Sequence, residues 1–180
     1  GDLLFTEEDR LPRAAVDEFL RRGERMAPLL VAILEDNATW EGDGPRGWAL
    51  VHAFYILAAM RPPGAFDVLV RATRKAIETD LDWINDPAVD ILGSFGVAAV
   101  PALKAIAMDR TAVDHVRWTA IDGLSQVAAE NLEAATEIAA IFRAVASDET
   151  DNESVREFAA MILLDLAVPE DKPLLLSLAD

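Results

Sequence analysis

The fold is decided by residues 96–109, which read GVAAVPALKAIAMD. Residues 23–36, GERMAPLLVAILED, repeat the same order: a glycine, a proline five residues later, and an apolar stretch that ends in aspartate eight residues after the proline. Pro28 and Pro101 are thus separated by two periods of about 36 residues. A fixed period of this length indicates a protein built from stacked helical repeats.

The period continues along the rest of the chain. The intermediate copy places Asp67 at the proline position, and later copies centre on Thr136 and Pro173. The half-repeats between these positions also recur, because VRWTAI at 116–121 parallels VREFAA at 155–160. Apolar positions in these runs follow helical spacing, and no segment alternates with a period of two, so the sequence predicts helices and no sheet.

The sequence therefore predicts an all-α chain of five helix pairs. A proline in the first turn of a helix costs little, and glycines separate the paired helices. The first helix of the third pair is expected to be short, because Pro87 opens it. A single pair cannot bury its apolar face, so neighbouring pairs must stack. The expected first helices are 12–22, 46–60, 87–95, 113–129 and 153–167, and the second helices are 24–36, 65–78, 98–108, 134–146 and 172–180.

This pattern resembles the HEAT-like repeats, including the short bacterial versions related to phycobilisome-lyase repeats. The resemblance rests on the Val-Arg runs that begin at Val116 and Val155, and on the Gly-to-Pro-to-Asp segments that begin at Gly23 and Gly96. It implies a right-handed α-solenoid of about five HEAT-like helix pairs. Residues 1–180 would then form a single HEAT-like repeat domain.

Composition excludes several classes of protein. The net charge of −16 opposes non-specific binding to nucleic acid and to anionic membranes, and it favours basic partners. The chain has no cysteine, which excludes disulfide scaffolds, thiolate metal sites and cysteine nucleophiles. No apolar run approaches the ~20 residues needed to cross a bilayer, and no signal peptide is visible, so a cytoplasmic location is expected.

Stacked pairs would bring the loops between repeats to one edge, and these loops are rich in acidic residues. Acids favour helix N-termini through capping and the helix dipole, so solvated capping loops are one interpretation. An acidic edge that binds a basic partner is the other. The loop acids are Glu35, Asp36, Glu41, Asp43, Glu78, Asp80, Asp82, Asp86, Asp109, Asp114, Asp148, Glu149, Asp151 and Glu153.

The second helices of such a solenoid line its concave face, and here they carry basic side chains. Most of these lie at offsets that share one helix face. They would form a locally basic groove for an acidic peptide or a phosphate-bearing ligand, with ordinary solvated helix surface as the alternative. The members of this groove are Arg71, Arg74, Lys75, Lys104 and Arg143.

Tryptophan and histidine supply the second set of candidate binding residues. Trp48, Trp83 and Trp118 recur once per repeat, which predicts indoles packed at repeat junctions or an exposed row of binding hot spots. His52 lies four residues after Trp48 on the same helix face, which favours a histidine packed under that indole over a ligand-contacting one. Trp40, in an acidic loop, is the tryptophan that is most expected to be partly exposed.

No motif in the chain indicates an enzyme. His52 and His115, the only histidines, form no metal-binding motif, and residues 80–91 lack the glycine and glutamate of a calcium loop. We therefore expect no catalytic residue, no metal and no cofactor. The expected function is a scaffold or adaptor that binds a protein partner with a basic or mixed-charge surface through the concave face or the acidic edge.

Two other classes of function stay open at this point. One is binding of a phosphate ligand or nucleic acid in the basic groove, although the net charge opposes nucleic acid. The other is a partner-dependent enzyme or chromophore-lyase subunit, which the resemblance to the lyase repeats implies. The apolar C-terminal helix at 172–180 also suggests a homodimer through that end.

Overall fold

The computed structural model describes residues 2–6, 9–166 and 171–178. These residues form α-helices, short 3-10 helices and the turns that join them, and none of them lies in a strand. The predicted all-α class is confirmed for this part of the chain. Contacts divide the chain into two compact units, Gly1–Asp86 and Pro87–Asp180. A single domain over the whole chain stays a prediction.

The first unit is built around α4 (Pro45–Met60), which packs against α2 (Ala27–Glu35) and α5 (Ala65–Glu78). The other elements of the unit are η1 (Asp2–Phe5), α1 (Arg13–Arg22), η2 (Gly23–Met26) and α3 (Asn37–Trp40), and α6 (Asp82–Gly93) begins in it. Its core contains the fully buried side chains of Leu4, Leu30, Leu50, Phe54, Leu57 and Leu69.

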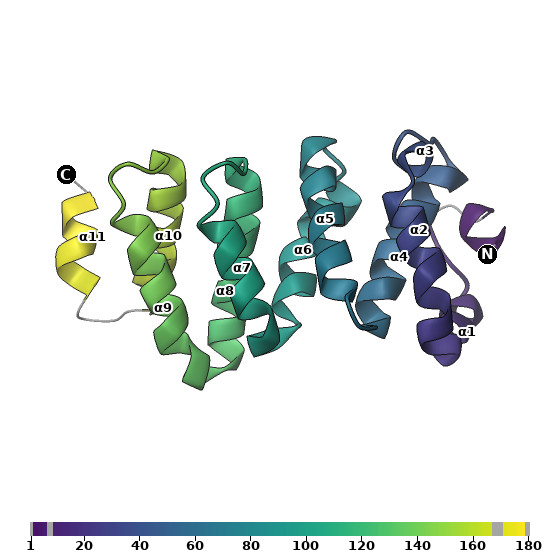
Figure 1. Ribbon diagram of the computed structural model, residues 1–180, viewed down its shortest axis with the longest axis horizontal. Coiled ribbons are helices and arrows are strands. Elements are labelled where there is room, and N and C mark those ends of the chain that lie inside the picture. The colour runs from purple at the N-terminus through teal and green to yellow at the C-terminus, as the bar shows by residue number, and fades with distance from the viewer. Residues whose placement is uncertain (1, 7–8, 167–170, 179–180) are drawn as a thin grey trace. The chain divides into compact units, whose positions relative to one another are not determined.

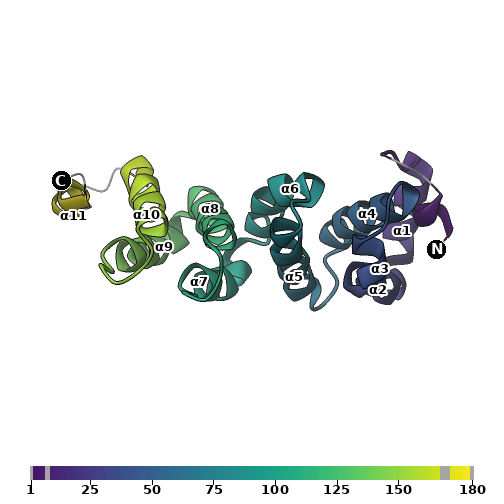
Figure 2. The ribbon, with the colours of Figure 1, turned by 90° about the horizontal axis from the view of Figure 1, so that it is seen from above.

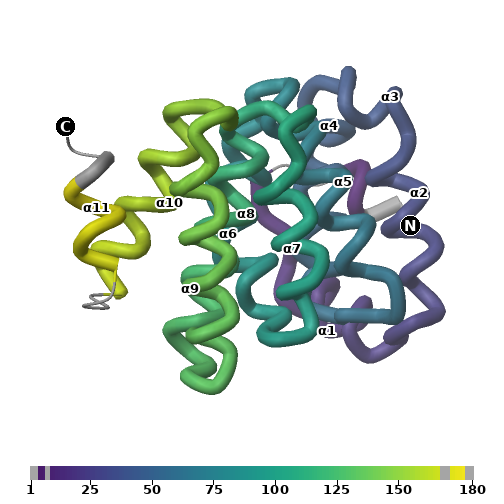
Figure 3. Tube along the Cα trace, turned by 60° about the vertical axis from the view of Figure 1, so that its left-hand side comes forward, coloured from purple at the N-terminus to yellow at the C-terminus, as the bar shows by residue number. Residues whose placement is uncertain are grey.

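The second unit consists of antiparallel helices joined by short connections. Asn131 alone joins α8 (Asp114–Glu130) to α9 (Leu132–Ala146), and the chain turns sharply there at the lower end of the unit (Figures 1 and 3). The remaining elements are η3 (Gly96–Ala99), α7 (Val100–Ala107), α10 (Glu153–Leu166) and α11 (Lys172–Leu178). The core contains Leu103, Ile121, Leu124, Phe142, Val155 and Leu163.

Each unit has its helices in two layers. In the second unit, α7 and α9 form one layer and α8 and α10 form the other (Figure 2). In the first unit, α2 and α5 lie on one side and α4 lies on the other (Figure 2). First and second helices of the predicted pairs are thus segregated within each unit.

The turn between α4 and α5 shows how the sequence ends one helix and begins the next. Arg61 takes the left-handed conformation, with φ of 47°, and its N–H donates to the carbonyl of Leu57. Pro62 disfavours a helical conformation for the residue before it, and Gly64 supplies a second positive φ, of 77°, as the N-cap of α5. The predicted ranges 46–60 and 65–78 therefore agree closely with α4 and α5.

The prediction was wrong for the first helix of the third pair. It was expected at 87–95, but α6 begins at Asp82 and contains Pro87 in its second turn. Asp82 and Asp86, expected in a loop, lie on this helix. The short helix α3 (Asn37–Trp40) was not predicted, and residues 167 and 179–180 of two predicted helices lie outside the described residues.

Equivalent side chains in successive pairs of the second unit make the same contact. The Nε of Arg117 donates to the carbonyl oxygen of Ala107 at 2.9 Å, and the Nε of Arg156 donates to that of Ala146 at 3.2 Å. Each arginine lies in the first turn of its helix and binds the C-terminal end of the helix before it. The Val-Arg run thus recurs in three dimensions as well as in the sequence.

Candidate functional site

The α4 helix presents three aromatic side chains on one face of the first unit. Trp48, His52 and Tyr55 lie at i, i+4 and i+7, the spacing that places residues on the same side of a helix. The imidazole of His52 stacks on the indole of Trp48 with 6.2 Å between ring centroids, and His52 is only 8% exposed. The predicted packing of this histidine against Trp48 is confirmed.

A second indole comes from the first turn of α6. The ring of Trp83 meets that of Trp48 edge to face, with 5.0 Å between centroids and 61° between planes, which is a favourable geometry for an aromatic pair. Trp48 is half-buried, whereas 59% of Trp83 is exposed. Trp83 therefore offers apolar surface to solvent at the place where it contacts α4.

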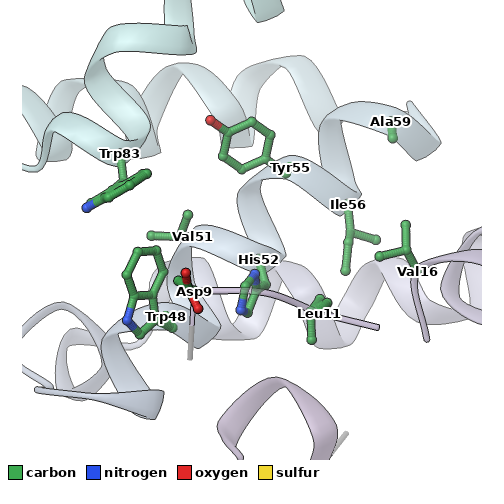
Figure 4. Close-up of a pocket in the computed structure, with 10 residues that line it drawn as sticks. All are labelled: Asp9, Leu11, Val16, Trp48, Val51, His52, Tyr55, Ile56, Ala59 and Trp83. Carbon is green, nitrogen blue, oxygen red and sulfur yellow. The ribbon is translucent and has the colours of Figure 1, made fainter. Parts of the chain in front are cut away.

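A pocket of about 360 Å³ opens along this face of α4. Its size falls within the range of ~300–1,000 Å³ that is typical of ligand pockets. Figure 4 shows the two indoles at one end and aliphatic side chains at the other. The lining residues are Asp9, Leu11, Val16, Trp48, Val51, His52, Tyr55, Ile56, Ala59 and Trp83.

Carboxylates supply the charge near the aromatic end of the pocket. Asp9 lines it and lies 3.7 Å from the Nε of Arg10, whose side chain is 90% exposed. Burial, and after it the negative charge of Asp86, raises the pKa of Tyr55 above its usual range. The Tyr55 hydroxyl therefore stays protonated at neutral pH and can donate a hydrogen bond.

The predicted basic residues of α5 are held by their own unit. Arg71 donates to Glu35 at 2.8 Å, and Lys75 donates to Asn37 at 2.6 Å and lies over the ring of Trp40, 4.8 Å from its centroid. These contacts surround a smaller pocket of about 180 Å³ between α2 and α5. Arg71 and Lys75 thus tie neighbouring helix pairs together.

Trp40 is partly exposed, as expected, but it lies in a helix and is not the most exposed tryptophan of the described residues. Its indole N–H donates to the carbonyl of Leu34 at 2.8 Å, and the side chain is half-buried under Lys75. Trp83 has the greater exposure. The sequence placed Trp40 in a loop, but Asp36 caps α3 by accepting from the Ala38 N–H, and this short helix turns the indole back onto α2.

The other members of the predicted basic groove belong to different helices, one in the first unit and two in the second. Arg74 is half-buried on α5 in the first unit, whereas Lys104 is exposed on α7 in the second. Arg143 on α9 binds both carboxylate oxygens of Asp171, which precedes α11 and is 3% exposed. This pair connects the C-terminal helix to the unit. A ligand groove formed by these residues stays a prediction, as does a homodimer through α11.

Trp118 lies in the second unit, where its ring contacts those of His115 and Phe158. The centroid distances are 4.8 Å to His115 and 5.7 Å to Phe158. Trp48 meets Trp83 in the first unit as Trp118 meets Phe158 in the second, so aromatic residues about one repeat apart touch within each unit. The half-buried position of Trp118 makes this second contact a packing contact.

Several acids of the predicted edge bind groups of their own chain. The carboxylate of Asp148 accepts hydrogen bonds from Arg110 and from the N–H and hydroxyl of Thr150. The bonds from Thr150, and after them the bond from Arg110, lower the pKa of Asp148. Asp114 accepts from the Ser154 hydroxyl at 2.9 Å. These contacts engage two of the loop acids within their own chain, but neither contact caps the N-terminus of a helix.

Sequence reasoning missed a buried ion pair at this edge. Arg117 is 1% exposed and donates to both carboxylate oxygens of Asp151, at 2.7 and 2.5 Å. Arg117 belongs to one of the two Val-Arg runs that indicate the repeat in the sequence. The available signal was therefore the recurrence of arginine at a position that packs against the preceding helix.

The described residues contain no group of three His, Asp or Glu side chains placed to hold a metal ion. Among the same residues, no single helix has the length and apolar composition to cross a membrane, and one bent pair of helices, Asp82–Gly93 with Gly96–Ala107, meets that test.

Comparison with known proteins finds no matching family model, no matching curated protein and no matching solved structure.

Proposed function

We propose that the chain is a HEAT-like repeat protein that binds a protein partner, without catalysis, through the pocket of its first unit. In this proposal the helix pairs stack into a right-handed α-solenoid. The segregated layers within each unit and the recurring contacts of Arg117 and Arg156 support it. Solenoids of this kind present extended surfaces to their partners.

The observation that carries the proposal is the pocket lined by Trp48, Trp83 and Tyr55. Tryptophan and tyrosine are enriched among the residues that dominate binding energy at protein interfaces. Exposure of a large indole to water is unfavourable, and a partner that covers the indole gains the free energy of burying this apolar surface. Trp83, with 59% of its surface exposed, is therefore the expected centre of the interface.

The alternative of a phosphate or nucleic-acid ligand has less support. Arg71 and Lys75 already have acceptors on Glu35 and Asn37, and a ligand would have to displace them. The net charge of −16 opposes a polyanion. A partner with basic groups fits this charge, because opposite charges speed the encounter of two proteins.

Selection from a random peptide library displayed on phage tests the proposal. The purified protein should enrich peptides that bind with a Kd in the micromolar range, and Trp83→Ala should weaken them at least tenfold. Such a loss corresponds to the ~1.4 kcal/mol of a moderate interface residue. Leu132→Ala is the matched control, since Leu132 is 84% exposed on α9 in the other unit.

Circular dichroism and Tm of both variants establish that they are folded. Peptides that bind the wild type and the Trp83→Ala variant equally would contradict a role for the pocket. Failure of the library to yield any peptide that competes at this site would contradict the proposed function itself.

A further inference from the structure

The pocket of the first unit has two chemically different ends. Leu11, Val16, Ile56 and Ala59 make one end purely aliphatic. The other end combines the rings of Trp48, Trp83, Tyr55 and His52 with the carboxylate of Asp9 (Figure 4). A ligand that fills the pocket therefore meets hydrocarbon at one end and π-faces with negative charge at the other.

The aromatic end has the features that attract a cation. The face of an indole carries negative charge density and binds guanidinium or ammonium groups, an attraction worth about 0.5–2 kcal/mol depending on solvent exposure. Asp9 lines this end, and Asp86 lies near enough to act electrostatically on the Tyr55 hydroxyl. Arg10, the neighbour of Asp9, is almost fully exposed, so its pairing is weak and yields readily to a second cation.

We infer that the aromatic end binds the cationic group of an arginine or lysine side chain of the partner, while the aliphatic end binds an apolar side chain of the same segment. This inference rests on the proposed function and names the chemistry of the partner. The carboxylate of Asp9, which lines the pocket, and the net charge of −16 both favour a basic segment.

The length of the pocket sets the spacing between the two side chains. Trp48 and Ile56 are eight residues apart on α4, which corresponds to about 12 Å along the helix axis. An extended peptide advances about 3.3 Å per residue and alternates its side chains between two faces. A basic residue and an aliphatic residue four positions apart therefore reach both ends from the same face of an extended segment.

Four short peptides test this inference directly. The probe is acetyl-Arg-Ala-Ala-Ala-Leu-amide, and its companions carry lysine, citrulline or norleucine in place of arginine. Citrulline keeps the shape of arginine without its charge, and norleucine keeps the hydrocarbon stem. Kd is measured from shifts of the tryptophan indole N–H resonances in the full-length protein. The arginine and lysine peptides should bind at least fivefold more tightly than the two neutral peptides.

Charge variants separate the cation site from the apolar one. The double variant Asp9→Asn/Asp86→Asn should weaken the arginine peptide at least fivefold and change the norleucine peptide by less than twofold. Glu157→Gln/Asp165→Asn is the matched control for charge, because it also removes two carboxylates and both residues are exposed on α10 of the second unit. That control should leave all four peptides within twofold of the wild type.

The outcomes distinguish this inference from the proposed function. If library peptides bind at Trp83 but their basic residues can be replaced by neutral ones without loss, the proposed function stands and the cation site is refuted. Equal binding of the four defined peptides, or no binding of any of them, also refutes the cation site. If no peptide of either kind shifts the Trp48 or Trp83 resonance, both proposals fail.

Discussion

Arg117 is the residue whose environment departs most from that of an ordinary arginine. Its guanidinium is buried, with both branches on Asp151 and its Nε on the carbonyl of Ala107. Removing two charges from water is costly, and the cost is offset only when the geometry satisfies their hydrogen-bonding groups. Arg117 meets this condition and joins α7, α8 and the loop between α9 and α10.

Loss of that arginine should lower the stability of the protein. Arg117→Met keeps much of the volume but leaves the Asp151 carboxylate buried without its cation. The free energy of unfolding in urea at pH 7 should fall by about 3–5 kcal/mol. Arg156→Met is the matched control, because Arg156 makes the same backbone contact from a half-buried position and at 3.2 Å. It should cost about 1 kcal/mol.

The same variant has a pH dependence of known sign. The hydrogen bond from Arg117 lowers the pKa of Asp151 in the folded protein. The resulting stability is present above the unfolded pKa, near 4, and is lost as the pH falls through the lowered native value. The stability difference between wild type and Arg117→Met should therefore shrink below pH 4. A difference that stays constant down to pH 2.5, or a cost under 1 kcal/mol at pH 7, would contradict the ion-pair account.

At the scale of elements, the turn between α5 and α6 carries a strained residue. Asp80 has a φ of 58°, and the Leu81 N–H donates across it to the carbonyl of Ala76 at 2.9 Å. This arrangement ends a helix and most often uses glycine at the left-handed position. Aspartate tolerates that conformation better than most residues, but its Cβ still lies unfavourably close to the backbone, which costs free energy.

Replacing this aspartate by glycine should relieve the strain. Asp80→Gly should raise the free energy of unfolding by about 0.5–1 kcal/mol, since relief of left-handed strain exceeds the added freedom of the unfolded chain. Glu78→Gly, two residues earlier in regular helical conformation, should lower it by up to about 1 kcal/mol. Urea unfolding monitored by circular dichroism measures both. A loss of stability in Asp80→Gly would show that the aspartate side chain itself holds this turn.

The turns on either side of α5 explain where sequence reasoning succeeded and where it failed. Pro62 and Gly64 separate α4 from α5, because proline disfavours helix at the residue before it and glycine readily adopts the positive φ that precedes α5. No such marker precedes Asp82, since aspartate rather than glycine takes the positive φ at position 80. Pro87 was then interpreted as a helix start, although it lies in the second turn of α6.

The site was predictable to the extent that it depends on one helix. The spacing of Trp48 and His52 alone predicts their contact. Asp9 lies 36 residues before the start of α4 and Trp83 lies 23 residues after its end, so no local sequence pattern predicts that they line the same pocket. The partners of Arg71 and Lys75 were missed for the same reason, because they lie one repeat earlier in the chain.

At the scale of the whole molecule, negative charge is unevenly distributed. Residues 1–86 carry 16 acidic and 10 basic side chains, whereas residues 87–180 carry 16 acidic and 6 basic ones. Like charges repel within a compact unit and reduce its stability, and dissolved salt screens this repulsion. The second unit, with the larger excess of acids, should depend more strongly on ionic strength than the first.

Hydrogen exchange followed by mass spectrometry, at about 10 mM and about 150 mM NaCl, tests this dependence on ionic strength. The Debye length falls from ~30 to ~8 Å between these two salt concentrations. Core amides of α8, α9 and α10 should gain more protection with salt than core amides of α4 and α5, because exchange from the core reports the free energy of opening. Potassium fluoride at equal ionic strength should act like NaCl if screening is the cause. An equal gain of protection in both units, or a larger gain in residues 1–86, would show that excess acidic charge does not limit the stability of the second unit. Its acids would then be compensated locally, by ion pairs such as Arg110 with Asp148 and Arg117 with Asp151.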